Sequence, residues 1–158
     1  MEFQSKCPSK CLSPSPSYAE LLICYDAFVI DNQTLATVGD TAAAAPGLML
    51  LVVFGSRARG DGHDQSDWDL GYIGSATFDP DSWLAALVKA VGTDRVDLVD
   101  LTRAGALLRF RAASEGQSLY EARPGEFSRF WLDAVSFWCD VAPLVRAGYD
   151  SVLAELGT

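Results

Sequence analysis

The feature that most constrains this chain is an apolar run that stops at a glycine and a serine and resumes, after a polar loop, as a second strand. Leu48–Phe54 is a continuous apolar stretch of the length of a buried strand, and Trp68–Ile73 is the second candidate strand. Gly55 and Ser56 make a tight turn of small residues directly after the first strand. The pattern therefore predicts two neighbouring strands whose connecting loop begins at Gly55.

Two carboxylates, Asp67 and Asp69, open the second of these strands. Side chains at positions i and i+2 of a strand point to the same face, so both carboxylates project together at the mouth of the strand, close to the Gly-Ser turn. With no basic residue between them, such a pair is costly unless a cation lies beside it. Hard oxygen ligands favour Mg²⁺, which commonly takes one or two carboxylates and completes its shell with substrate phosphates.

The spacing of these residues resembles a known motif. Gly55-Ser56-x-x-x-Gly60 followed by Ser66-Asp67-x-Asp69-Leu70 is similar to the signature of the nucleotidyltransferase superfamily of the DNA polymerase β type. The fuller string Gly-Ser-Arg-Ala-Arg-Gly-Asp, a short gap before Ser-Asp-x-Asp-Leu, resembles its small prokaryotic branch of minimal nucleotidyltransferases (MNT). Proteins of that branch act as antitoxins paired with HEPN-type ribonuclease toxins. The resemblance covers residues 35–121, and the combined motif is specific.

The resemblance implies nucleotidyl transfer by two metal ions that three carboxylates hold. Asp67 and Asp69 match the first two ligands. Asp97, on a third predicted strand (Arg95–Leu101), matches the third, which would bind the catalytic metal and help to deprotonate the attacking hydroxyl. Strand parity places Asp100 on the opposite face from Asp97, so we interpret Asp100 as a strand-end cap or a surface charge. The implied cofactors are two Mg²⁺ ions, with ATP as the co-substrate.

By the same resemblance, the turn and loop before the second strand would bind the nucleotide. Gly55 and Ser56 let backbone N–H groups approach the β- and γ-phosphates without a Cβ in the way. Arg57 and Arg59 would offset the triphosphate charge, and either one is equally well explained as a solvated surface arginine. Ser66 would cap the second strand and orient the carboxylate that follows it.

The rest of the chain predicts alternating helices and strands. Helices are expected over residues 32–45, 79–91 and 104–113, with an interruption at Gly39, and further strands over 95–101 and 117–120. This order suggests an α+β fold, a mixed sheet of about four strands flanked by helices that lie against one face. The resemblance identifies it as the nucleotidyltransferase fold.

We divide the chain into an N-terminal extension of residues 1–30, flexible at least to residue 17, a nucleotidyltransferase domain of residues 31–123, and a C-terminal helical segment of residues 124–158. The last segment carries apolar and aromatic residues at i, i+3, i+4 spacing, and Pro143 is expected to kink or break its helix. Its aromatic surplus either packs on the sheet or docks a second protein, and the two are compatible.

Charge and composition exclude several classes of function. The formal net charge of −9 argues against nucleic-acid binding as the main role, and fits a basic partner, a substrate that arrives with Mg²⁺, or plain solubility. The longest apolar run, Gly47–Gly55, is too short to span a membrane, and no secretory signal is evident. Cys7, Cys11, Cys24 and Cys139 are too few and too scattered for a disulfide scaffold, so we expect free thiols in a reducing cytoplasm.

By resemblance, we therefore predict an antitoxin that transfers AMP from ATP to a tyrosine hydroxyl of a cognate HEPN-family ribonuclease toxin, with which it forms a hetero-oligomer. The chain has no room for a second, substrate-binding domain, which favours an acceptor that a partner presents. The alternatives are a stand-alone transferase that acts on a small hydroxylated molecule such as an aminoglycoside, and a purely steric antitoxin with a vestigial active site. The residues leave open the acceptor and the number of AMP units added.

Overall fold

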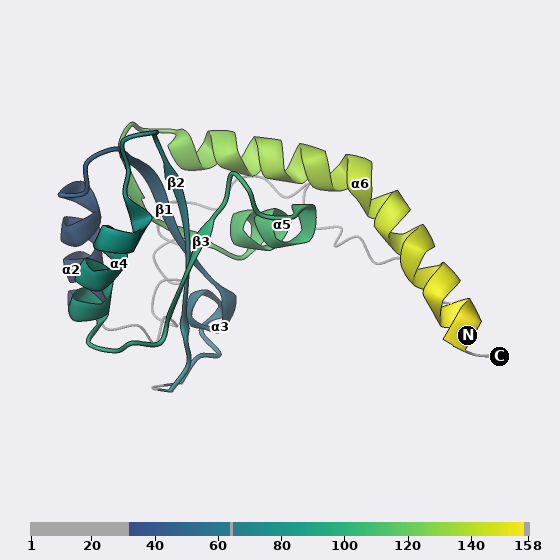
Figure 1. The fold of residues 1–158 in the computed structure, drawn as a ribbon, viewed down its shortest axis with the longest axis horizontal. Helices are drawn as coiled ribbons and strands as arrows, with labels where there is room; N and C mark the ends of the chain where they lie inside the picture. The colour runs from purple at the N-terminus through teal and green to yellow at the C-terminus, as the bar shows by residue number, and fades with distance from the viewer. Residues whose placement is uncertain (1–31, 64, 157–158) are drawn as a thin grey trace, which may run out of the picture.

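The apolar run after Gly47 forms the central part of a four-stranded mixed sheet (Figure 1). The computed structural model describes residues 32–63 and 65–156. Strand β1 (Leu48–Phe54) pairs antiparallel with β2 (Trp68–Gly74) on one side and with β4 (Gln117–Glu121) on the other, and β2 pairs in parallel with β3 (Val96–Asp100). The strand order is β3-β2-β1-β4, which confirms the predicted mixed sheet.

Five helices are described between and after these strands. They are α2 (Asn32–Ala43), α3 (Gly55–Arg59), α4 (Pro80–Val91), α5 (Ala106–Ser114) and α6 (Glu126–Leu156). The start of α4 is as predicted, because the Asp79 carboxylate accepts hydrogen bonds from the backbone of Asp81 and Ser82, and Gly92 ends the helix with a φ of 73°. The Ser82 hydroxyl also donates to the Asp79 carboxylate. This bond is the largest cause that lowers the pKa of Asp79, and the backbone hydrogen bonds lower it further.

The predicted interruption of the first helix at Gly39 is wrong. Helix α2 runs through Gly39 without a break. Val38 and Ala42 of the same helix are fully buried against the sheet. A glycine inside a helix costs about 1 kcal/mol relative to alanine, and the packing of these two side chains offsets that cost.

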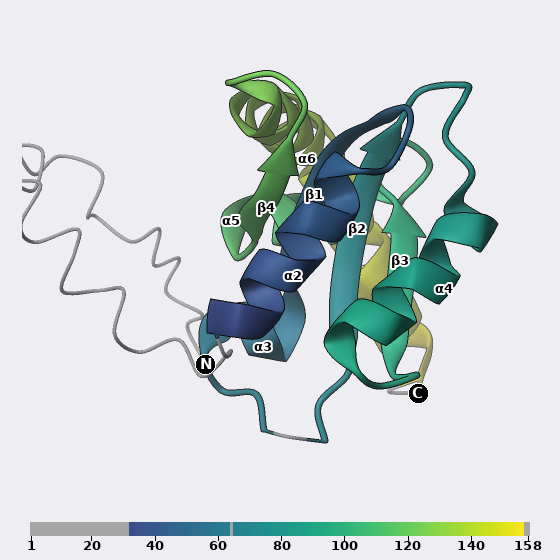
Figure 2. The ribbon, with the colours of Figure 1, turned by 90° about the vertical axis from the view of Figure 1, so that its left-hand side faces the viewer.

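Helices cover both faces of the sheet, so the expectation that they lie against one face is also wrong. Alternate residues of β1 enter two separate cores: Leu51 and Val53 pack on the side of α2 and α4, and Leu50 and Val52 pack on the side of α5 and α6. Figure 2 shows α2 and α4 in front of the strands and α5 and α6 behind them. The physical reason is that the central strand is apolar at every position and needs a cover on each side.

Helix α6 begins over the sheet and extends beyond it. Phe130 and Ala134 in its first half are buried in the second core, together with Leu101 and Ala112. The helix continues through Pro143, so Pro143 does not break it, while Figure 1 shows its axis turning in the second half, as expected of a proline kink.

Within the described residues, no helix is long and apolar enough to cross a membrane. Cys139 is an exposed free thiol. Cys7, Cys11 and Cys24, and the predicted N-terminal extension, lie outside the described residues.

Candidate active site

The register between β2 and β3 brings two of the predicted carboxylates side by side. Asp69 is the direct partner of Asp97 in this parallel pair. The neighbouring residues Trp68 and Leu70 face the core under α2 and α4, so both Asp69 and Asp97 project from the other face, the one that carries α5 and α6. Asp67, two residues before Asp69, belongs to the same side of the strand by parity.

Asp100 does not belong to this group. It pairs with Tyr72 in the β2–β3 register, and its Oδ1 accepts hydrogen bonds from the backbone N–H of Thr102 (2.9 Å) and from the Thr102 hydroxyl (2.6 Å). Arg103 adds an ion pair to the same carboxylate at 3.6 Å. Asp100 is therefore the cap at the end of its strand, as the parity of the sequence predicts.

The three carboxylates influence each other electrostatically. Burial raises the pKa of Asp69, and the negative charges of Asp97 and Asp67 raise it further, while Arg59 acts in the opposite direction. The site thus carries repulsion between like charges that a bound cation would relieve. Its carboxylate oxygens are ligands of the kind that Mg²⁺ prefers. Within residues 32–63 and 65–156, no group of three or more His, Cys, Asp or Glu side chains is placed to hold a metal ion.

Gly55 makes the close approach of the turn to Asp69 possible. Its φ is +72°, and a Cβ placed on it would lie only 2.0 Å from Oδ2 of Asp69. Any side chain here would displace the carboxylate. The residues that follow form the short helix α3 instead of the expected loop, so Ser56 lies in its first turn, where backbone N–H groups have no partner within the helix.

Arg57 stabilises the loop between α3 and β2, which leads to the carboxylates. Its Nε and one terminal nitrogen donate to the carbonyl oxygen of Ser66 at 3.0 and 2.5 Å, and its guanidinium carbon lies 4.6 Å from the centre of the Trp68 ring. The Ser66 hydroxyl accepts a hydrogen bond from the backbone of the exposed His63 (2.9 Å), so it stabilises a turn inside the loop. The contacts of Arg57 and Ser66 therefore organise the loop itself.

Arg59 extends toward a second acidic group that sequence reasoning missed. It forms ion pairs with Asp61 at 3.3 Å and with Glu115, after α5, at 2.9 Å. The hydrogen bond that Arg59 donates to Glu115 is the main cause that raises the pKa of Arg59. Arg95 donates to the carbonyl oxygen of Gln65 (2.7 Å).

A cavity of about 680 Å³ opens beside Asp69 and Gly55 and extends between α5 and α6. We call it the α5–α6 cavity. Beyond Arg59, Arg111 and Glu115, its walls are mostly apolar and include Trp138 and Tyr149 of α6. Trp138 belongs to the segment in which the sequence predicts an apolar and aromatic stripe, but the cavity depends on how α5 and α6 pack, which that stripe does not specify.

Comparison with known proteins connects this geometry to a family. A sequence profile described as Polymerase beta, Nucleotidyltransferase matches residues 38–124. A protein adenylyltransferase MntA of Aphanizomenon flos-aquae is 34% identical over 101 residues, which cover 54% of this chain and 65%, just under two thirds, of that protein. A protein of the same name from Shewanella oneidensis is 30% identical over 113 residues, which cover 70% of this chain and 80% of that protein.

Solved structures share the fold. A crystal structure of a toxin-antitoxin with AMP-PNP superposes with a TM-score of 0.65 at 25% identity, over 75% of this chain and 98% of that one. A tri-AMPylated Shewanella oneidensis HEPN toxin in complex with MNT antitoxin gives a TM-score of 0.61 at 22% identity, over 76% and 96% of the two chains, which is a likeness of fold.

Proposed function

This chain belongs to the Polymerase beta nucleotidyltransferase family, and from that premise we propose that it is an antitoxin that transfers AMP from ATP to a tyrosine hydroxyl of a cognate HEPN-family ribonuclease toxin. Both curated relatives are named protein adenylyltransferases, and the similar solved structure is a toxin-antitoxin with AMP-PNP. We place the activity in the cytoplasm, a reducing compartment in which the exposed thiol of Cys139 stays free.

The observation that carries this proposal is the pairing of Asp69 with Asp97 across adjacent parallel strands, against Gly55 and within electrostatic reach of Asp67. Asp67 and Asp69 would hold two Mg²⁺ ions and Asp97 would hold one of them. When bound, the ions supply charge stabilisation for the phosphates and the attacking oxygen. Gly55 and Ser56 at the start of α3 present backbone N–H groups to the terminal phosphates.

In the reaction, the tyrosine oxygen forms a bond with the α-phosphorus of ATP, and the bond between that phosphorus and the pyrophosphate oxygen breaks. Asp97, which lies on the exposed side of the site, accepts the hydroxyl proton and releases it to solvent. The products are the tyrosine–AMP ester and pyrophosphate. The loop that Arg57 fastens keeps Asp67 in place during this exchange.

The toxin would dock on the exposed apolar side chains of α6. Trp131, Leu132 and Phe137 are exposed on this helix although they are large and hydrophobic. The net charge of −9 suits a basic partner, whose approach it would accelerate.

Two of the three carboxylates can be neutralised one at a time. Asp67→Asn and Asp97→Asn each remove a negative charge from the site, so AMP transfer from radiolabelled ATP to the purified toxin should fall by on the order of 10²–10⁴-fold while the thermal midpoint is kept. The matched control is Asp100→Asn, on the same strand as Asp97 but on the opposite face, where the amide oxygen can still accept from Thr102. Control activity should match that of the original chain.

Normal labelling by the Asp67→Asn variant would show that the assignment of the site is wrong. The steric alternative is tested with the Asp67→Asn, Asp69→Asn double variant: if it neutralises the toxin as well as the original chain does, AMP transfer is not how the antitoxin works.

A further inference from the structure

The α5–α6 cavity starts at the site of the reaction and leads away from it. At one end it is lined by Gly55 and Asp69, the residues at which the phosphates and metal would lie. At the other end, its walls come from two helices. The wall residues include Leu107, Leu108 and Arg111 of α5, and Trp138, Val141, Val145 and Tyr149 of α6. The cavity thus changes from polar at the Asp69 end to mostly apolar between the helices. A ligand with one highly charged end and one flat, apolar end matches this change in polarity.

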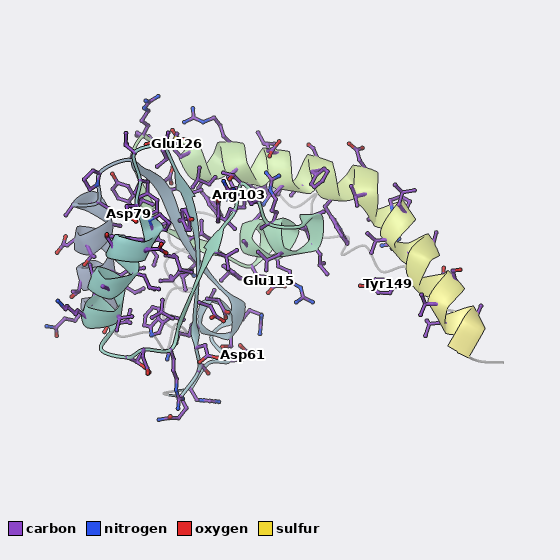
Figure 3. The ribbon with its side chains drawn as sticks, viewed as in Figure 1. Asp61, Asp79, Arg103, Glu115, Glu126 and Tyr149 are labelled. Carbon is purple, nitrogen blue, oxygen red and sulfur yellow. The ribbon has the colours of Figure 1, made fainter. Side chains whose placement is uncertain are left out.

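Two aromatic side chains of α6 give the far end its shape. Trp138 is stacked on Phe110 with ring centroids 5.5 Å apart and planes 20° from parallel, so the indole is held in one orientation. Tyr149 is 61% exposed, and Figure 3 shows it pointing from α6 back toward α5 and Glu115. A planar group in the cavity would therefore meet a fixed indole and an exposed phenol that can close over it.

Resting on the proposed function, we infer that the α5–α6 cavity is the seat of the nucleoside, with the nucleobase of the triphosphate against Trp138 and Tyr149. The volume of about 680 Å³ lies within the range typical of small-molecule sites and is generous for a single phenol ring. Aromatic side chains bind nucleobases by stacking, which every base permits. Arg59, between the two ends, faces both Asp69 and the cavity and suits the charged middle of the ligand.

The acceptor tyrosine enters from a different side. Asp97, which we assign to the proton of the attacking hydroxyl, is exposed and does not line the cavity, and the same holds for Asp67. The reacting carboxylates therefore have two approaches: an apolar cavity next to Asp69, and an open surface next to Asp97. A tyrosine carried by a folded protein needs the open surface, because the whole toxin must remain outside.

The test measures equilibrium binding of two probes in the presence of Mg²⁺: a non-hydrolysable ATP analogue and inorganic tripolyphosphate. Tyr149→Ala and Trp138→Ala should each weaken binding of the analogue about tenfold and leave the affinity for tripolyphosphate unchanged, because only the analogue carries a base. The matched controls are Leu144→Ala and Trp131→Ala, exposed apolar residues of the same helix outside the cavity. Both controls should bind the two probes like the original chain.

Tyr149→Ala decides the question even if Trp138→Ala fails to fold, because Tyr149 is mostly exposed. An unchanged affinity for the analogue in the Tyr149 variant overturns the inference, and so does an equal loss for both probes. If that variant instead raises only the KM for the toxin, the cavity seats the acceptor and the inference is also wrong. None of these results touches the proposed function, which fails separately if the original chain binds the analogue but does not label the toxin.

Discussion

Gly55 is the residue on which the geometry of the site depends most directly. A Cβ at this position would be strained by the positive φ and would also strike Oδ2 of Asp69. Gly92 has nearly the same φ of +73°, but a methyl group added there would meet nothing within 4 Å, so it separates the two effects. Gly92→Ala should cost roughly 1–2 kcal/mol of unfolding free energy from backbone strain alone and keep full activity.

Gly55→Ala should cost more than Gly92→Ala and should abolish AMP transfer, because the methyl group and the Asp69 carboxylate cannot occupy the same space. Denaturant unfolding and the labelling assay together measure the two quantities. Equal activity in the two alanine variants would mean that Asp69 moves without consequence, and its position against the turn would then be unimportant for the reaction.

The raised pKa of Asp69 predicts how the stability of the fold depends on pH. Its pKa is raised in the folded chain, chiefly by burial and then by Asp97 and Asp67. The folded state therefore binds this proton more tightly than the unfolded state does. The resulting penalty to stability appears as pH rises from the ordinary carboxyl pKa through the raised one. Asp69→Asn removes it, so in metal-free buffer at pH 7 the thermal midpoint should rise by about 2 °C, a small effect because solvent screens the site.

The gain from Asp69→Asn should shrink as the pH falls below the ordinary carboxyl range, where the original side chain is protonated in both states. Added Mg²⁺ should raise the midpoint of the original chain and leave that of the variant nearly unchanged, since the ion stabilises only a state that binds it. If the thermal midpoint of the variant is lower than that of the original chain at pH 7 without metal, the Asp69 carboxylate makes net favourable contacts in the folded state, and the expected repulsion is absent.

At the scale of elements, what the sequence predicts well is what depends on local period. The parity of β3 separates Asp97 from Asp100, and both positions are as expected in the structure. The bounds of α4 are equally local: the predicted range 79–91 agrees with Pro80–Val91, which Asp79 and Gly92 cap. These features need only the two-residue period of a strand or the hydrogen bonds of one turn.

Two kinds of feature are not predicted from the sequence: very short elements, and contacts that join distant elements. The five-residue helix α3 is too short for a hydrophobic period to reveal it, and the ion pair between Arg59 and Glu115 joins residues that only the folded sheet brings together. The presence of helices on both faces of the sheet could have been predicted from the sequence. A strand that is apolar at every residue from Leu50 to Phe54 must be buried on both of its faces. The α5–α6 cavity could not have been predicted in this way, since the spacing of α6 indicates an apolar face without showing what lies opposite.

The molecule as a whole consists of one sheet between two separate apolar cores, and α6 has a different role in each half. Its first half closes the core on the side of the active site, where Phe130 packs with Leu50, Val52 and Leu101. Its second half projects past the sheet and forms a wall of the α5–α6 cavity (Figure 1). The helix therefore links the stability of the domain to the shape of the cavity.

Two phenylalanines of α6 separate packing in the core from docking at the surface. Phe130 is 4% exposed and Phe137 is 42% exposed, with the guanidinium of Arg109 over its ring at 5.8 Å. Phe130→Ala should lower the free energy of unfolding by about 3–5 kcal/mol, because it leaves a void in the second core, whereas Phe137→Ala should lower it by about 1 kcal/mol or less. Denaturant unfolding measures both. If Phe137 docks the toxin, its alanine variant should bind the ATP analogue normally and bind the toxin more weakly. Comparable losses of stability in the two variants would mean that Phe137 packs in the fold as Phe130 does.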